Sequence, residues 1–199
     1  VTVNVGAGTD TADRGIDYDS AAAVVATVGT TFTIAAIDDV LADSDEIFTL
    51  ALSEDWSRAS EFEDVVYGSG VTTTIIDEAE PDAVTLNIAG PSSVLEGDVT
   101  TPYTLSLVDD EGNAIIAETD IVVTVTYTGT ATDGSDYTSE TPIRIAAGSS
   151  SATFDLQTLD DSIADNGETI VLTISTEDDG GFEAIELGND EVTTTIVDD

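Results

Sequence analysis

The stretch Phe154-Asp-Leu-Gln-Thr-Leu-Asp-Asp161 has a counterpart earlier in the chain, Phe32-Thr-Ile-Ala-Ala-Ile-Asp-Asp39, at an offset of 122 residues. Each begins with phenylalanine, carries spaced aliphatic residues and ends in two aspartates. Three further pairs of segments match in the same order: 15–18 with 134–137, 43–52 with 165–174, and 71–77 with 192–198. Four matched pairs in one order indicate an internal repeat.

The repeat predicts two domains in the 199 residues. We assign residues 1–80 to an incomplete first repeat and residues 81–199 to a complete second one. The boundary is the acidic segment 77–82, in which Pro81 stiffens a very short linker. Residues 81–121 open the second repeat and have no counterpart in the first. Either the sequence starts inside a repeat, or the missing strands come from elsewhere.

Short segments of the second repeat alternate between apolar and polar residues, which is typical of half-buried β-strands. Val84, Leu86 and Ile88 would share one face of such a strand. Turn residues such as Gly90-Pro91 and Asn166-Gly167 separate these segments. About seven short strands in a repeat of this length favour an all-β fold of tandem antiparallel Greek-key β-sandwiches, immunoglobulin-like in type.

The charge of the chain excludes several functions. Asp and Glu number 42 against three Lys and Arg, for a net charge of -39. Such a chain offers nothing to neutralise a phosphate backbone, so we expect no nucleic-acid partner. No apolar run is long enough to cross a bilayer, so we expect no direct membrane insertion. The self-repulsion calls for high salt, bound divalent cations or both.

Catalysis has little support in the composition. His and Cys are absent, and the three basic residues are all arginines, so Ser-His, Cys-His and Schiff-base chemistry are unavailable. A paired-carboxylate glycosidase stays formally open. However, the acidic pairs recur in both repeats at the same strand ends, which fits architecture better than an active site. We therefore predict that the protein is not an enzyme.

Carboxylates gather where strands are expected to end, as in Asp160-Asp161, Asp198-Asp199 and Asp38-Asp39. Like charges at the end of a buried strand repel each other unless a counter-ion lies between them. Calcium takes six to eight oxygen ligands and tolerates flexible loops better than magnesium does. The pattern thus predicts Ca²⁺ sites, the alternative being a solvated acidic surface with Asx turns.

These motifs carry a family resemblance. The segments 129–137 (GTATDGSDY), 159–161 (LDD) and 195–199 (TIVDD), with Glu168 between the last two, resemble the Calx-beta domain, the calcium-binding sandwich named for the sodium–calcium exchanger. They also resemble the extender repeats of large RTX adhesins. The resemblance covers almost the whole second repeat and the latter two-thirds of a first.

The resemblance implies a calcium ligand set in each repeat. In the second repeat these ligands are Glu96, Asp136, Asp160, Asp161, Asp165, Glu168, Asp198 and Asp199. In the first repeat they are Asp17, Asp38, Asp39, Asp43, Glu46, Asp77 and Glu78. The first repeat has no counterpart of Glu96, and Ser162 stands where the exchanger has a denser acidic run. Both departures imply fewer or weaker ions.

The sequence suggests three functions. The first is a structural spacer of a secreted, calcium-dependent bacterial adhesin at the cell surface, with ions at strand ends and at the junction between repeats. Its partners would be neighbouring repeats, and other domains of the parent protein would contact a host or surface ligand. The second is a carbohydrate- or protein-binding module, for which only Trp56 and Phe62 offer a hint. The third, a calcium sensor, suits the acidity poorly.

Overall fold

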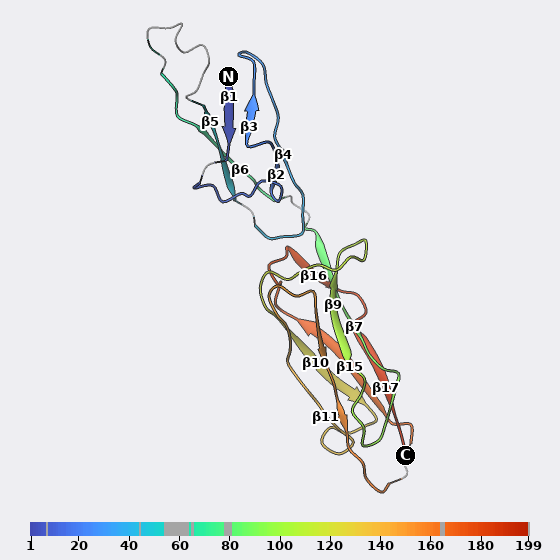
Figure 1. The fold of residues 1–199 in the computed structure, drawn as a ribbon. Helices are drawn as coiled ribbons and strands as arrows, with labels where there is room; N and C mark the ends of the chain where they lie inside the picture. Colours follow the sequence, from blue (N-terminus) through green and yellow to red (C-terminus); the bar gives the residue numbers. More distant parts are fainter. Residues whose placement is uncertain are drawn as a thin grey trace. The chain divides into compact units, whose positions relative to one another are not determined.

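The computed structural model describes residues 1–6, 8–43, 45–53, 64, 66–77, 81–163 and 166–198 (Figure 1). This described part is built from β-strands and contains no helix, hence none that could span a membrane. The prediction of an all-β fold is confirmed. The chain divides into two compact units, Val1–Pro81 and Asp82–Asp199.

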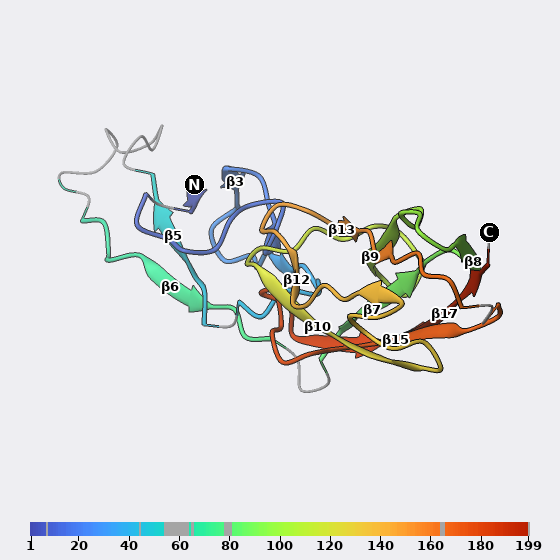
Figure 2. The same cartoon turned by 90° about the horizontal axis from the view of Figure 1, so that it is seen from below.

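The second unit is a sandwich of two sheets (Figure 2). One sheet has the order β12 (Ile143–Ile145), β10 (Ile121–Gly129), β15 (Thr169–Thr176), β17 (Glu191–Val197), β8 (Ser93–Leu95). The other has the order β13 (Ser151–Phe154), β9 (Tyr103–Val108), β7 (Ala83–Ala89), β16 (Ala184–Leu187). A separate short pair joins β11 (Tyr137–Thr138) to β14 (Gln157–Thr158).

The core lies between the two sheets. Every second residue of β7 and β15 points inward, so that Leu86, Ile170 and Leu172 have no exposed surface. The hydroxyls of Tyr103 on β9 and Thr194 on β17 lie 2.6 Å apart and are buried, which links the sheets by a hydrogen bond. Alternating apolar residues thus produce the two-layer fold that their spacing predicts.

Two strand pairs depart from a purely antiparallel sandwich: β16 pairs with β7, and β17 with β8, in parallel. The chain crosses from one sheet to the other between β7 and β8, and again between β16 and β17. The two crossing segments run side by side, because Asn189 accepts a hydrogen bond from the Ile88 N–H (2.8 Å) and Gly188 donates one to Leu86 (3.0 Å). The two strands of each flanking pair, β7 with β16 and β8 with β17, therefore run parallel to each other.

The first unit repeats one of these sheets. Its strands are β1 (Thr2–Val5), β2 (Tyr18–Asp19), β3 (Ala23–Val25), β4 (Ala35–Ala36), β5 (Ile47–Leu52) and β6 (Val71–Thr74). The sheet order β3-β1-β5-β6 matches β12-β10-β15-β17, and the pair β2-β4 matches β11-β14. Among the described residues of this unit, no strand corresponds to β7, β9 or β13.

We predict that substitutions at equivalent positions of β5 and β15 lower the free energy of unfolding of the two units by different amounts. Ile174 on β15 is 2% exposed, whereas Leu52, its counterpart on β5, is 45% exposed. Ile174→Ala should lower the free energy of unfolding of the second unit by about 2–5 kcal/mol, because it leaves a cavity. Leu52→Ala should cost the first unit less than about 1 kcal/mol. Native-state hydrogen exchange reads each unit separately, and equal costs would contradict the difference in burial.

Candidate metal centre

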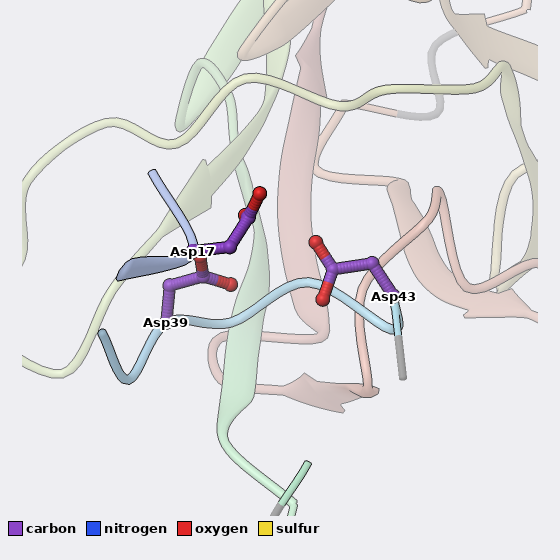
Figure 3. Close-up of side chains that lie close together, drawn as sticks. All are labelled: Asp17, Asp39 and Asp43. Atoms are coloured by element: carbon purple, nitrogen blue, oxygen red, sulfur yellow. The ribbon is translucent and has the colours of Figure 1, made fainter. Parts of the chain in front are cut away.

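Three predicted ligands of the first unit converge. Asp17 lies directly before β2, Asp39 follows β4, and Asp43 precedes β5. One carboxylate oxygen from each of the three lies within 4.8 Å of the other two, and Figure 3 shows the three side chains turned toward a common space. Asp17 is buried, and the other two are partly buried. It is the one acidic group this compact within the described part of the chain.

Backbone hydrogen bonds hold these loops in place. The carbonyl of Asp17 accepts a hydrogen bond from the Ile37 N–H at 2.9 Å, which joins the start of β2 to the end of β4. Oδ1 of Asp39 accepts one from the Leu41 N–H at 2.8 Å. Oδ2 of Asp17 accepts a short one from the Asp13 N–H. The carboxylates of Asp17 and Asp39 are thus fixed by turns of their own loops, as expected for aspartate.

Glu46 adds a fourth carboxyl group beside them. The pKa of Glu46 is raised from 4.5 to about 7. Burial is the largest cause. The hydrogen bond to Asp17 and the negative charges of Asp17, Asp43 and Asp13 raise the pKa further. Its Oε2 atom is buried and has no hydrogen-bond partner among the described residues. A buried carboxylate oxygen without a partner is costly, and a bound cation would satisfy it.

The second unit reproduces the same loop contacts. Oδ2 of Asp136 accepts a hydrogen bond from the Thr132 N–H at 2.5 Å, as Asp17 does from Asp13. The Asp136 carbonyl accepts one from the Leu159 N–H at 2.9 Å, as Asp17 does from Ile37. The internal repeat therefore extends to the turn geometry around its carboxylates.

In the second unit, Glu96 lies in the loop after β8 and contacts Asp161. Its Oε1 accepts a hydrogen bond from the Asp161 N–H at 2.8 Å. This bond lowers the pKa of Glu96, but burial, the hydrogen bond to Asp198 and the charges of Asp161 and Asp198 outweigh it, so that the pKa is raised. Glu96, Asp161 and Asp198 thus lie together, although they are far apart in the sequence.

Gly97 lets this loop approach Asp160. A Cβ atom at Gly97 would lie 3.1 Å from Cβ of Asp160, closer than ordinary contacts, and the positive φ of 77° disfavours other residues. The close approach places the Asp160-Asp161 turn against the loop that carries Glu96. A residue with a side chain at position 97 would push the two apart.

The other predicted ligands have different surroundings. Asp38 and Asp160 are exposed, whereas Asp77 and Glu168 are partly buried. The Glu168 carbonyl accepts a hydrogen bond from the Ile196 N–H at 2.8 Å, which positions its backbone near the end of β17. Glu78, Asp165 and Asp199 lie outside the described residues, and so do Trp56 and Phe62, the aromatic residues considered for a glycan surface.

Sequence reasoning missed Asp13. Its charge contributes to the raised pKa of Glu46, and its N–H binds the Asp17 carboxylate. The corresponding residue of the second repeat is Thr132, so the repeat comparison gave no acidic pattern at this position. The signal available was the short spacing of Asp13 and Asp17, which places both in one tight turn.

The first cluster fits a hard cation. It offers carboxylate oxygens from Asp17, Asp39, Asp43 and Glu46, and the chain contains no His, Cys or Met. Oxygen ligands on loops match the coordination of calcium, which is larger and less demanding in geometry than magnesium. Soft metals prefer thiolates and imidazoles, which this chain lacks.

Comparisons with known proteins give similarities of structure only. No protein-family model matches the chain, and no curated protein matches its sequence. Among solved structures, the chain is similar to the apo form of the Calx CBD1 domain, with 18% identity and a TM-score of 0.47 over 58% of this chain and 97% of that one.

Two further solved structures cover more of the chain. The calcium binding domain CBD12 of CALX1.1 has 15% identity and a TM-score of 0.41 over 98% of this chain and 86% of that one. Domains 4 and 5 of the S-layer protein SbsC have 15% identity and a TM-score of 0.32 over 77% of this chain and 65% of that one.

We predict a pH dependence of the metal-free first unit. The pKa of Glu46 is about 7 in the folded chain against an ordinary 4.5, so the folded state holds a proton that the unfolded state releases between these values. The stabilisation is complete below about pH 4.5 and is lost as pH rises through 7. Glu46→Gln should flatten this slope in EDTA, measured by thermal unfolding from pH 5 to 8.

The control is Glu186→Gln, since Glu186 is exposed on β16 of the second unit. It should leave the pH slope as it is in the unsubstituted chain. An unchanged slope in Glu46→Gln would show that Glu46 is not the titrating group.

Proposed function

We propose that the chain is a pair of calcium-binding β-sandwich repeats that serves as a structural spacer in a secreted, cell-surface protein of the adhesin type. The convergence of Asp17, Asp39 and Asp43 at the strand ends carries this proposal. The group lies in the first unit, and its loop contacts are repeated around Asp136 in the second. A feature that recurs with each repeat supports a structural role.

Calcium binding would remove a conflict in the fold. The β2-β4 pair and the start of β5 bring Asp17, Asp39 and Asp43 together, although these carboxylates repel one another. A divalent cation between them replaces repulsion with attraction. Its binding free energy would then stabilise the folded unit by mass action, since the unfolded chain holds no such group.

The loop before β5 is also hydrogen-bonded to the segment that follows β6, at the end of the first unit. The Ile75 N–H donates to the Glu46 carbonyl at 2.7 Å, and the Asp45 N–H donates to the Ile75 carbonyl at 3.0 Å. Asp77 follows two residues later, and β7 begins at Ala83. An ion bound by the loop before β5 would therefore also hold in place the first residues of the short, acidic linker to the next repeat.

In this proposal the partners are neighbouring repeats of the same protein. The charge of -39 would keep such a chain from associating with other acidic surfaces. Calcium at millimolar concentration, as found outside cells, matches the affinity of extracellular modules, with dissociation constants on the order of 10⁻⁴–10⁻³ M. Contact with a host or a surface would be made by other domains of the parent protein.

We predict opposite effects of Asp39→Asn with and without calcium. Without metal, the substitution removes one of three crowded charges and should raise the melting temperature of the first unit. In calcium it removes a ligand, so calorimetric titration should show that site weakened about tenfold or more. Asp19→Asn is the matched control, because Asp19 lies two residues from Asp17 but is exposed.

Magnesium at the same concentration tests the choice of metal. The proposal expects a clearly larger rise in melting temperature with calcium than with magnesium, at fixed high sodium chloride. Stabilisation by salt alone, with no added effect of calcium, would assign the acidity to adaptation to salt and would contradict the metal site.

We also predict that calcium couples the motions of the two units. Nuclear spin relaxation of backbone amides should give the units similar rotational correlation times in calcium and different ones in EDTA. Asp39→Asn should reduce the coupling, whereas Asp19→Asn should not. Units that tumble independently to the same degree in both conditions would contradict the spacer role while leaving calcium binding intact.

A further inference from the structure

The segment between β1 and β2 lines a polar pocket in the first unit. The pocket has a volume of about 380 Å³, which lies in the range of small-molecule sites. Its lining residues are Gly6, Asp10, Ala12, Asp13, Arg14 and Tyr18. Tyr18 and its counterpart Tyr137 are both 2% exposed, so Tyr18 is buried without the strands that are described only in the second unit.

The hydroxyl of Tyr18 lies at this pocket beside Gly6. A Cβ atom at Gly6 would be 2.8 Å from the hydroxyl oxygen, and the positive φ of 79° also favours glycine at this position. The Tyr18 ring stacks on Phe48 with the ring centroids 4.6 Å apart. Within the residues that the structure describes, the hydroxyl forms no hydrogen bond. The hydroxyl of a buried tyrosine usually has a partner, and a ligand in the pocket would supply one.

Two groups of opposite charge lie near this hydroxyl. A nitrogen of the Arg14 guanidinium is 3.3 Å, and Oδ2 of Asp10 is 3.8 Å, from the same Cβ position at Gly6. The guanidinium donates a short hydrogen bond to the Val5 carbonyl. The Asp10 carboxylate accepts hydrogen bonds from the Thr49 N–H (2.8 Å) and hydroxyl (2.9 Å). Both side chains are thus held in place, and the guanidinium keeps N–H groups for a ligand.

The second unit does not repeat this charged pair. At the offset of 119 residues that relates the two turns, Arg14 corresponds to Asp133. Asp10 corresponds to Gly129, which has no side chain. The Asp133 carboxylate accepts hydrogen bonds from the N–H and the hydroxyl of Ser139, at 3.0 and 2.7 Å. The polar groups of the pocket are therefore not part of the repeated architecture, which points to a separate role.

We propose that this pocket binds a neutral ligand that carries adjacent hydroxyls, a single sugar unit of a glycan. A chain with a charge of -39 repels anions, and Arg14 repels a cation inside the pocket. Two adjacent sugar hydroxyls donate to Asp10 and accept from Arg14, because a hydroxyl does both. The Tyr18 hydroxyl binds a third sugar oxygen. This inference goes beyond the spacer proposal and does not depend on calcium binding.

A zwitterion such as glycine is the competing ligand, with its carboxylate on Arg14 and its ammonium group on Asp13. Both of these side chains are exposed. Ion pairs at exposed groups are weak and are screened by salt. Hydrogen bonds to neutral hydroxyls do not rely on long-range attraction, and the Tyr18 hydroxyl adds another. The sugar therefore matches the pocket better.

Methyl hexosides are the probes, because each is a neutral ring with adjacent hydroxyls. Methyl mannoside, methyl galactoside and methyl glucoside are titrated separately into the isotope-labelled full chain at high sodium chloride. EDTA is present, so that no sugar binds through a calcium ion. At least one hexoside should bind with a dissociation constant in the millimolar range and shift the amide resonances of Gly6, Asp10 and Arg14. Amides of the second unit should not shift.

Tyr18→Phe and Tyr137→Phe form a matched pair of variants. Tyr18→Phe removes only the hydroxyl and keeps the ring that stacks on Phe48. It should weaken hexoside binding about tenfold and leave the melting temperature of the first unit unchanged, because the hydroxyl has no partner in the described part of the chain. Tyr137→Phe makes the same change in the second unit and should leave hexoside binding as it is.

Arg14→Gln tests the charged partner. It removes the fork of N–H donors and should weaken hexoside binding about tenfold or more. Arg144→Gln is the control, since Arg144 is an exposed arginine that pairs with Asp120 in the second unit. Because Arg14 also binds the Val5 carbonyl, circular dichroism checks that the variant folds. If it does not fold, Tyr18→Phe decides the question.

Three results would overturn the proposal. The first is the absence of amide shifts with all three hexosides at high millimolar concentration. The second is hexoside binding that Tyr18→Phe leaves unchanged, which would place the sugar elsewhere. The third is tighter binding of glycine than of any hexoside at the same residues, which would assign the pocket to a zwitterion. None of these results bears on the calcium site.

Discussion

Repulsion between carboxylates at the strand ends is the constraint on which the rest of this structure depends. The β2-β4 pair and the loop before β5 bring one carboxylate oxygen each of Asp17, Asp39 and Asp43 within 4.8 Å of one another. With three basic residues against 42 acidic ones, the chain has few charges of its own to offset this. The fold is therefore coupled to whatever cations the solution supplies, and the raised pKa of Glu46 shows the same conflict in a proton-binding form.

The sequence predicted those parts of the site that are determined locally. Asp17 and Asp136 precede matching tyrosines, and each binds a backbone N–H four residues earlier, so one motif sets one turn. The alternation of apolar and polar residues likewise predicted the all-β fold class, because it too is a local pattern. The parallel pairing of β16 with β7 could not be predicted, because it depends on where the chain changes sheets. The roles of Asp13 and of the buried Glu46 Oε2 atom depend on tertiary packing that the repeat pattern does not contain.

Comparison of the two units distinguishes the strands that carry the carboxylates from the strands that cover the core. The sheet order β3-β1-β5-β6 and the β2-β4 pair match their counterparts in the second unit, although the first unit has no described equivalent of β7 and β9. The carboxylate group belongs to this shared part, whereas the covering sheet mainly buries apolar residues such as Ile174. Metal binding and closure of the core are thus distinct requirements, met by different strands of the repeat.

The most direct test is a crystal structure of the chain grown in calcium chloride, with anomalous differences collected at a long wavelength. Our account predicts a strong peak between Asp17, Asp39 and Asp43, with Glu46 Oε2 at 2.3–2.6 Å from it, the usual calcium–oxygen distance. Crystals grown in magnesium alone should show no peak of this strength. A well-ordered first unit in calcium whose three aspartates hold only water would contradict the account, and the acidic strand ends would then be a solvated surface.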